Sequence, residues 1–366
     1  MKACKFLILT LAAALPFGLA ACGGGGGGGN DGGNPNPAFT TTATLAQAAG
    51  ATFNVGLALN DTTVVVGTMD GGATPTTLKA VAWTVTPGIA PAPPTSNFTP
   101  LALPALHGPY GAAYGINNAG AIVGETVVTA SGLIVPAYWT NNTATAALLP
   151  LGLTATQGTA YGLNTAGRIA GEVIEVGVTK AVTWDTSAAL APTLLSTSTL
   201  APPTTASSAY FINDNGEIVG ELSDAAGTHA AVWRALAGVY GDPILLSAPG
   251  TLAGNSIALS INTAGNIVGE VEDSTSGLVH AVRWMKGTGT AFTAVDLGPT
   301  GSNSGAAGIN AAGRTVGYVG ANASAWGPTV TPVTMNAALT DSHGLAINSG
   351  GQTVGLSGGQ AFVALP

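Results

Sequence analysis

Short apolar runs alternate with polar turn residues along most of this chain, and the alternation itself repeats with a long period. From residue 39 onward the pattern Ile/Leu-Asn-x-x-Gly-x-x-Val-Gly occurs seven times, and its first and last asparagines span six intervals with a mean of 48 residues. The aligned asparagines are Asn60, Asn117, Asn164, Asn213, Asn262, Asn310 and Asn348, and the closing glycines are Gly67, Gly124, Gly171, Gly220, Gly269, Gly317 and Gly355. A period of this length predicts an array of equivalent structural units.

Each repeat contains four apolar runs, which predict four short antiparallel strands. In the fourth repeat the runs are Ala209 to Ile212, Glu217 to Leu222, His229 to Trp233 and Pro243 to Leu246. The Asn-x-x-Gly segment between the first two predicts a type I turn, which the Asn side chain caps and the Gly closes in a left-handed conformation. The first repeat has Thr63 in place of this Gly, so we expect a looser turn there.

The third run of six repeats carries a tryptophan, and the seventh repeat has Ala364 at that place. The six are Trp83, Trp139, Trp184, Trp233, Trp284 and Trp326. One large side chain per unit can fill the wedge between adjacent twisted sheets, which is the interpretation we favour. The alternative is a series of aromatic platforms for sugars.

Together these patterns predict an all-β, seven-bladed β-propeller over residues 39–366. The seventh repeat ends in its third strand, Ala361 to Pro366, and Thr40 to Leu45 precedes the first repeat where a fourth strand would lie. An N-terminal strand that completes the last blade would close the ring and remove two exposed edges.

Composition narrows the class of protein. Charged residues make up 7% of the chain, against about 25% in typical domains. With 9 basic and 17 acidic residues, a net charge of −8 and no basic run, the chain has no means of neutralising nucleic-acid phosphates. No stretch beyond the extreme N-terminus reaches the roughly 18 uninterrupted apolar residues of a membrane span. We expect a monomer.

The N-terminus has the layout of an export signal. Two lysines, an apolar stretch and small residues over residues 1–21 predict a secretory signal, and the Gly/Asn/Pro-rich residues 22–38 predict a flexible tether. Leu19-Ala20-Ala21-Cys22 resembles the lipobox of bacterial lipoproteins. That resemblance implies acylation of Cys22, anchoring in the lipid bilayer and, because Gly23 rather than Asp follows, the outer membrane, with either face open. The alternative is an ordinary signal peptide with a chance cysteine.

The repeat core also resembles the bacterial extracellular HAF-repeat proteins, named for a His-Ala-Phe tripeptide. His229-Ala230 and His280-Ala281 keep the first two residues of that tripeptide and Ala361-Phe362 the last two, but none is complete. The resemblance implies an exported, propeller-like repeat protein and no defined activity.

No zinc, phosphate-loop or nucleophile motif is present, and we expect no cofactor and no metal. Asn213 to Glu217 superficially resembles a calcium loop, but it occupies the hairpin turn of its repeat, so we interpret it as a turn. One regular charged feature follows the closing glycines of repeats two to five: Glu125, Glu172, Glu221 and Glu270. We expect these to be solvated strand ends; the alternative is that they bind a cation or a basic partner.

Binding residues usually lie on loops held by a rigid scaffold. In this topology the variable loops emerge on the side opposite the Asn-x-x-Gly turns. The candidate ligand residues on that side are Asp70, His107, Asp224, Glu272, Asp273, Asp341 and His343. Because these ionisable groups are few and scattered, we predict a non-catalytic binding module for a glycan or protein partner. The alternative is a lyase or hydrolase with its site at the mouth of the ring.

Overall fold

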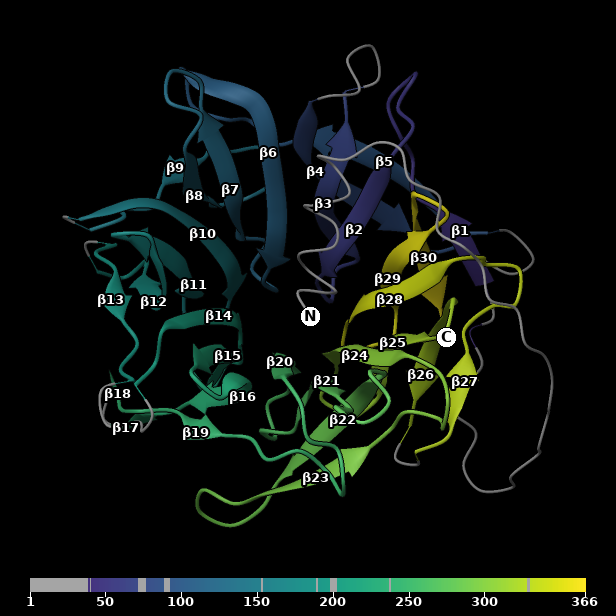
Figure 1. Cartoon of the computed structure of the whole chain (residues 1–366). Coiled ribbons are helices and arrows are strands. Elements are labelled where there is room, and N and C mark those ends of the chain that lie inside the picture. The colour runs from purple at the N-terminus through teal and green to yellow at the C-terminus, as the bar shows by residue number, and fades with distance from the viewer. Residues whose placement is uncertain are drawn as a thin grey trace.

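The computed structural model describes residue 39 and residues 41–366, apart from 72–76, 89–92, 153, 189, 198–202, 237 and 328–329. The predicted signal segment 1–21 and tether 22–38, with Cys22, lie outside these described residues. Within them the chain is all-β, and no helix there is long and apolar enough to span a bilayer. Seven four-stranded antiparallel sheets surround a central axis and form a seven-bladed β-propeller (Figure 1).

The first strand of each blade lies nearest the axis, and the following strands lie progressively farther out. Blades 1 to 3 consist of β2 (Asn54–Leu59), β3 (Val64–Asp70), β4 (Leu78–Thr86) and β5 (Thr95–Pro100); β6 (His107–Ile116), β7 (Ile122–Val128), β8 (Ile134–Trp139) and β9 (Ala147–Leu148); and β10 (Ala155–Leu163), β11 (Arg168–Glu175), β12 (Val178–Asp185) and β13 (Thr193–Leu194).

Blades 4 to 6 continue the same order around the ring. They consist of β14 (Ala206–Ile212), β15 (Ile218–Asp224), β16 (Gly227–Trp233) and β19 (Ile244–Leu245); β20 (Ser256–Ile261), β21 (Ile267–Glu272), β22 (Val279–Lys286) and β23 (Phe292–Asp296); and β24 (Ser304–Ile309), β25 (Thr315–Val319), β26 (Asn322–Trp326) and β27 (Pro332–Thr334). Blade 4 also carries a small hairpin that the repeat pattern did not predict, β17 (Ala235–Leu236) with β18 (Val239–Tyr240).

The two ends of the described chain meet in blade 7. This blade contains β28 (Ser342–Ile347), β29 (Thr353–Ser357) and β30 (Gln360–Leu365), and its outermost strand is β1 (Thr41–Thr44). β1 pairs antiparallel with β30, from Thr41 opposite Leu365 to Thr44 opposite Phe362. The predicted closure of the ring by an N-terminal strand is therefore confirmed, although Thr40 lies outside the described residues.

The predicted turns are present in all seven blades. The backbone N–H of each repeat asparagine donates to the carbonyl of the residue four positions later, and its own carbonyl accepts the N–H of the residue three positions later. Six of the turns close on a glycine with φ between 78° and 86°. The expectation of a looser first turn is wrong. Thr63 itself adopts the left-handed conformation, with φ 62°, and makes the same backbone bond to Asn60. Its hydroxyl donates to the carbonyl of Val85 at 2.7 Å, which helps to hold this unusual threonine conformation.

A β-bulge in the innermost strand explains the closing glycine. In every blade the register between the first two strands shifts by one residue beside this glycine, for example between Ala113 and Gly115 opposite Gly124. A Cβ at any of the seven closing glycines would lie 1.9 to 2.1 Å from a carbonyl oxygen of the innermost strand. Since no side chain fits there, the pattern demands glycine.

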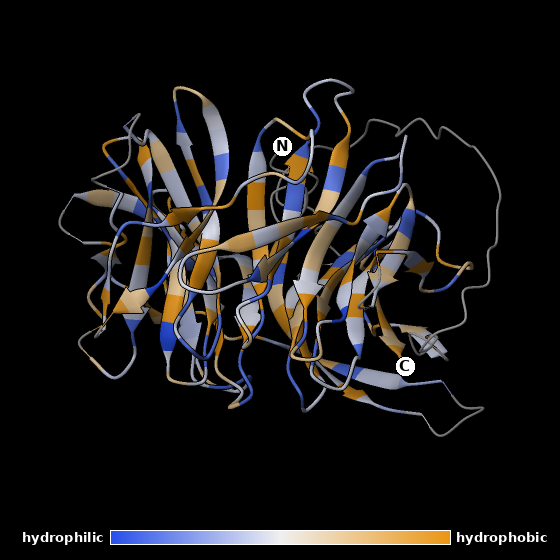
Figure 2. Cartoon of the chain, turned by 90° about the horizontal axis from the view of Figure 1, so that it is seen from below, coloured by the Kyte–Doolittle hydropathy of each residue, from blue (hydrophilic) through white to orange (hydrophobic). Residues whose placement is uncertain are grey.

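The tryptophans pack between blades, as we favoured from the sequence. All six are at most 1% exposed, and each lies in the wedge between its own blade and the preceding one. Each indole Nε1 donates to a backbone carbonyl at 2.6 to 3.1 Å, so the polar atom is satisfied inside the core. In the corresponding wedge beside Ala364, the buried ring of Phe362 supplies the bulk. Seen from the rim, the strands show alternating hydrophobic and hydrophilic bands (Figure 2).

Candidate functional site

The end of the channel on the side of the Asn-x-x-Gly turns is encircled by a ring of asparagine side chains. The Nδ2 of each repeat asparagine donates to the main-chain carbonyl of the next one at 2.9 to 3.2 Å, and Asn348 donates to Asn60 to complete the circle. Each Oδ1 accepts the backbone N–H four residues later in its own turn at 2.9 to 3.0 Å. The seven asparagines therefore cap the turns and link the blades at once.

Outside this asparagine ring lies a shallow hollow of about 260 Å³. Its polar side chains bond to the neighbouring repeat: Asn118 donates to Asp61 at 2.8 Å, and Asp214 accepts from the backbone N–H of Thr165 at 2.9 Å. The hollow thus uses its polar groups to join one blade to the next.

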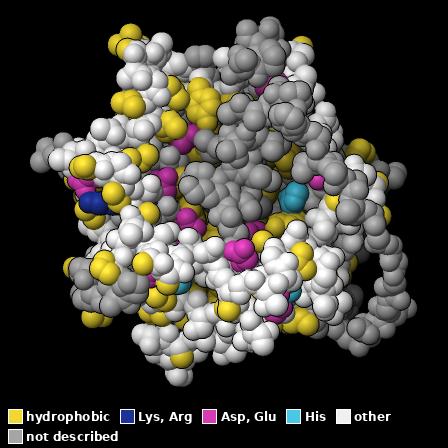
Figure 3. Space-filling model, in the orientation of Figure 1, with side chains coloured by type: hydrophobic (Ala, Val, Ile, Leu, Met, Phe, Trp, Pro, Cys, Tyr) yellow, Lys and Arg dark blue, Asp and Glu magenta, His cyan; other side chains and the backbone are white. Residues whose placement is uncertain are grey.

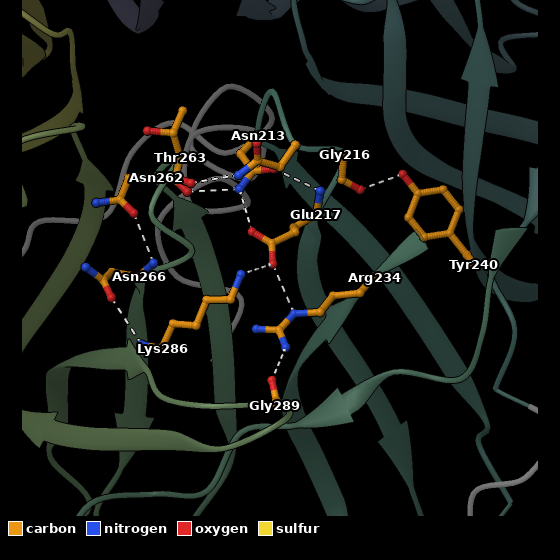
Figure 4. Close-up of polar contacts among 11 residues, drawn as sticks. Asn213, Gly216, Glu217, Arg234, Tyr240, Asn262, Thr263, Asn266, Lys286 and Gly289 are labelled. Carbon is orange, nitrogen blue, oxygen red and sulfur yellow. Dashed lines mark hydrogen bonds and ion pairs between the residues drawn. The ribbon is translucent and has the colours of Figure 1, made fainter. Parts of the chain in front are cut away.

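The segment from Asn213 to Glu217, which superficially resembled a calcium loop, takes part in the same contacts between blades (Figure 4). The carboxylate of Glu217 accepts hydrogen bonds from Nδ2 of Asn213 at 2.9 Å and from Nζ of Lys286 at 2.8 Å. It also forms an ion pair with Nε of Arg234 at 3.0 Å. Burial opposes ionisation of Glu217, but these donors outweigh it and lower the pKa of the carboxyl. Blades 4 and 5 are tied together here, and the interpretation of this segment as a hairpin turn is confirmed.

The opposite end of the channel is built from tyrosine and glutamate pairs in blades 2 to 4. Tyr114 and Tyr161 donate to Glu125 and Glu172 at 3.0 and 3.1 Å, and Tyr210 hydrogen-bonds to Glu221 in the same way. The three tyrosines are 2 to 4% exposed and form a contiguous row, with neighbouring ring centroids 5.5 Å apart. Together with apolar residues of the other innermost strands, they form the wall of the channel.

The expectation that the four glutamates are solvated strand ends is wrong. Glu125, Glu172 and Glu270 are 1%, 8% and 0% exposed, and Glu221 is half-buried. The physical reason is that the second strand of each blade continues past the closing glycine, so each glutamate lies inside its strand and not at the end. Its side chain contacts the innermost strand of the next blade. Glu125, for example, accepts from Thr159 of blade 3 at 2.8 Å.

Burial changes the acidity of this region. It raises the pKa of Glu125, and hydrogen bonds from Thr159, Tyr114 and Tyr110 offset only part of that effect. It also raises the pKa of the Tyr114, Tyr161 and Tyr210 phenols, next to the carboxyls they face. The tyrosines therefore stay protonated and act as hydrogen-bond donors to the carboxyls.

Blades 5 to 7 continue this polar lining with a different set of groups. Glu270 is fully buried beside Tyr318, and burial raises its pKa to about 7, an effect that Tyr318 offsets in part. The ring of Tyr318 meets the imidazole of His343 edge-to-face, with centroids 4.6 Å apart. Burial lowers the pKa of His343, with an opposing effect from Asp341, so its imidazole is neutral near pH 7.

The loop residues proposed as ligand candidates mostly support their own loops. Asp70 is buried and accepts from the backbone N–H groups of Thr52 and Phe53; Asp224 and Asp273 cap turns, and Asp224 also pairs with His229. Glu272 accepts from Asn255, His107 lies against the carbonyl of Ala105, and Asp341 is an exposed loop residue with φ 46°. Of the seven, His343 is the one that joins the channel lining.

Two features of the site went unpredicted, although one had a signal. Tyr114, Tyr161 and Tyr210 each stand three residues before a repeat asparagine, a regular spacing that alignment of the repeats reveals. The asparagine ring had no such signal, because its bonds join residues of different blades.

We call this end of the channel, with Glu125, Glu172, Glu221, Glu270, the tyrosines and His343, the acidic mouth. Figure 3 views this side of the propeller, with acidic side chains gathered around its centre and histidine side chains among them. Among the described residues, no group of three or more His, Cys, Asp or Glu side chains is placed to hold a metal ion. The acidic mouth can accept hydrogen bonds and attract positive charge.

Comparison with known proteins identifies no family for the chain. No family model matches, and no curated protein matches either. Of 17 solved chains that match, one is a structure from Agrobacterium tumefaciens that carries the name TolB, with 12% identity, a TM-score of 0.41, and coverage of 86% of this chain and 91% of that chain. At this identity and TM-score the likeness says nothing about what this chain binds.

Proposed function

We propose that this protein is a non-catalytic binding module, an exported and lipid-anchored propeller that offers the acidic mouth of its channel to a partner. The observation that carries this proposal is the difference between the two ends of the channel. At the turn end the repeat asparagines bond to one another and link the blades, whereas at the loop end buried carboxyls and phenols gather around the channel axis.

The carboxyls of the acidic mouth favour binding over catalysis by the way they are held. General acid–base catalysis needs a group that can reach a substrate proton. The carboxyl of Glu125 instead receives three hydroxyl donors, from Tyr110, Tyr114 and Thr159, at 2.8 to 3.2 Å. Such a carboxyl contributes negative charge and shape to a site rather than a free proton acceptor.

One observation favours a second candidate, an enzyme of the lyase or hydrolase class. The pKa of Glu270, about 7, is one that a general acid would have near neutral pH. Ligand turnover distinguishes the enzyme from the binding module. An enzyme must consume its ligand, and Glu270→Gln must abolish that turnover while the protein stays folded.

Between the two partner classes, the structure favours a protein. Sugar-binding aromatic platforms need an open ring face, and the tyrosine rings of the channel and all six tryptophans are buried. A glycan remains the alternative partner.

Export and anchoring depend on residues outside the described part of the chain. The signal segment 1–21 and Cys22 support the proposal through their resemblance to a lipoprotein signal, and an outer-membrane location with either face follows from Gly23. A propeller of this composition, with no basic cluster in its sequence, is compatible with an envelope protein and unsuited to nucleic acid.

Cross-linking from defined positions tests the proposed function. A photoreactive residue at exposed Asp341, on the loop side, should yield a discrete adduct in intact cells, whereas one at exposed Ser349, on the turn side, should not. Mass spectrometry of the adduct distinguishes a protein from a glycan. Equal labelling from both positions, or none from Asp341, would overturn the proposal.

A further inference from the structure

Glu270 differs from the other well-described carboxyl of the acidic mouth in its hydrogen bonding. Glu125 accepts hydroxyl donors on both oxygens, at 2.8 to 3.2 Å. The phenol of Tyr318 lies beside the Glu270 carboxyl and favours its ionised form. By geometry, however, neither oxygen of Glu270 has a well-aligned hydrogen-bond donor among the described residues, although the side chain is 0% exposed. No lysine or arginine of the described chain forms an ion pair with it. An ionised carboxyl in such a place is costly unless something else supplies the donors.

The missing donors correspond to two departures from the repeat. In blade 2 the phenol three residues before the asparagine, Tyr114, donates to the glutamate of its own blade; in blade 5 that position is Leu259. In blade 3 Thr159 donates to the glutamate of the preceding blade; in blade 6 the aligned residue is Gly305. Two of the three hydroxyl donors that serve Glu125 are therefore absent around Glu270.

Gly305 also makes room for the carboxyl. A Cβ at this glycine would lie 2.1 Å from Oε1 of Glu270 and 2.4 Å from Cε1 of Tyr318. Glu270 thus reaches across to the innermost strand of blade 6, at the channel wall, and fills the space that a side chain would occupy. Glycine at position 305 therefore removes the hydroxyl donor that Thr159 supplies in blade 3, and it also leaves room for the carboxyl of Glu270.

The two unpaired oxygens of Glu270 favour a hydrogen-bond donor that carries a positive charge. Tyr318 and the neutral imidazole of His343 form an aromatic wall beside Glu270, and an aromatic wall attracts cations.

We propose that Glu270, Tyr318 and His343 bind the protonated amine of a lysine side chain from a protein partner. This inference rests on the proposed binding function and names the group recognised at its site. The ammonium group supplies the hydrogen-bond donors that Leu259 and Gly305 withhold, and its charge offsets that of the buried carboxyl. The surplus of acidic residues in the chain attracts such a partner.

Isothermal titration calorimetry on the full-length, detergent-purified protein tests the proposal with matched probes. A lysine-containing tripeptide should bind, and its acetyl-lysine counterpart, which has no charge, should not. Glu270→Gln should weaken binding of the lysine peptide by about tenfold or more. The matched control, Glu175→Gln, changes a carboxyl that pairs with Lys180 in blade 3, outside the acidic mouth, and should leave the affinity unchanged.

A second variant separates recognition from simple stabilisation. Leu259→Tyr restores the phenol that blades 2 to 4 carry, so it should raise the melting temperature and weaken the lysine peptide at the same time. A gain in melting temperature with unchanged affinity would show that Glu270 is only a structural group and would overturn the proposal.

The outcomes also distinguish this inference from the proposed function. If the lysine peptide fails to bind, or binds equally to Glu270→Gln, the amine assignment falls, while cross-linking from Asp341 still decides whether the loop side binds a partner. If D-glucosamine binds and the lysine peptide does not, the amine belongs to a sugar, and the assignment to a protein partner is overturned.

Discussion

Asn348 in the last repeat donates its side-chain amide to the main-chain carbonyl of Asn60 in the first, at 3.1 Å. The bond joins residues 288 positions apart and completes a circle of seven equivalent bonds. A propeller with a terminal strand in its last blade is already held at its rim, by β1 on β30. The asparagine ring adds a second closure at the axis, where the blades come closest together.

Asn262→Asp tests the ring with a nearly isosteric change. The new carboxylate still accepts the backbone N–H of Asn266, but it cannot donate to the carbonyl of Asn310, now 3.0 Å from an oxygen. We expect a loss of about 1–3 kcal/mol in the free energy of unfolding, measured by urea denaturation. Asn97→Asp, at an exposed position in β5, is the control and should be nearly neutral. Equal effects at the two sites would contradict the structural role of the ring.

Deleting the closing strand tests the rim. Removal of 41–44 leaves β30 with an unpaired edge, which invites pairing with another chain. The melting temperature should fall, and size-exclusion chromatography should show dimers or aggregates. Deletion of residues 23–33, in the predicted tether, should have neither effect. A monomer of unchanged melting temperature after loss of 41–44 would refute the closure.

Two substitutions at one tryptophan separate packing from hydrogen bonding. Trp233→Ala leaves a cavity between blades 3 and 4 and should cost about 3–5 kcal/mol. Trp233→Phe keeps most of the ring but loses the Nε1 bond to the carbonyl of Ser196, 3.1 Å away, and should cost about 1–3 kcal/mol. Thermal and chemical unfolding measure both. The packing role would be wrong if the alanine variant were as stable as the phenylalanine variant.

Local signals in the sequence predicted the fold well because they act within one repeat. The 48-residue period, the Asn-x-x-Gly turns and the tryptophan positions defined the blades, and the surplus segment before the first repeat defined the closure. The two errors have local causes as well. Thr63 adopts a conformation that usually selects glycine, and Glu125 looked like a strand end because it follows the closing glycine, whereas β7 continues to Val128.

The candidate site was harder to predict because it forms between blades. Glu125 meets Thr159 from the next blade, and Glu270 meets Gly305 in the same way. Ionisable residues on variable loops attracted attention instead, yet Asp224 and Asp273 serve their own turns. Departures from a repeat, such as Leu259 and Gly305, carry the information about a site, but they acquire meaning only once the neighbours across the blades are known.

The predicted anchor has a chemical test of its own. Intact mass measurement of membrane-extracted protein should show a chain that begins at Cys22 and carries two or three acyl chains, since one acyl chain alone anchors only marginally. Cys22→Ala should release the protein from the membrane fraction. Recovery of a mature chain that still contains Met1 would exclude this processing.

Glu270 should make stability depend on pH in a defined direction. Its pKa is about 7 in the folded protein against an ordinary value of 4.5, so the folded state holds a proton that the unfolded state has released. Stability from this group is therefore greatest at low pH and falls as the pH rises from about 4.5 to about 7, by an amount on the order of 3 kcal/mol. Burial raises the pKa of Glu125 as well, and its effect has the same sign.

Glu270→Gln, which stays neutral, should flatten this part of the profile and unfold at a higher denaturant concentration than the wild type at pH 8. Because the lysine peptide binds the ionised carboxyl, adding it at pH 8 should recover part of the lost stability in the wild type and none in the variant. A variant with the same pH profile as the wild type would show that Glu270 is not buried as an uncompensated acid.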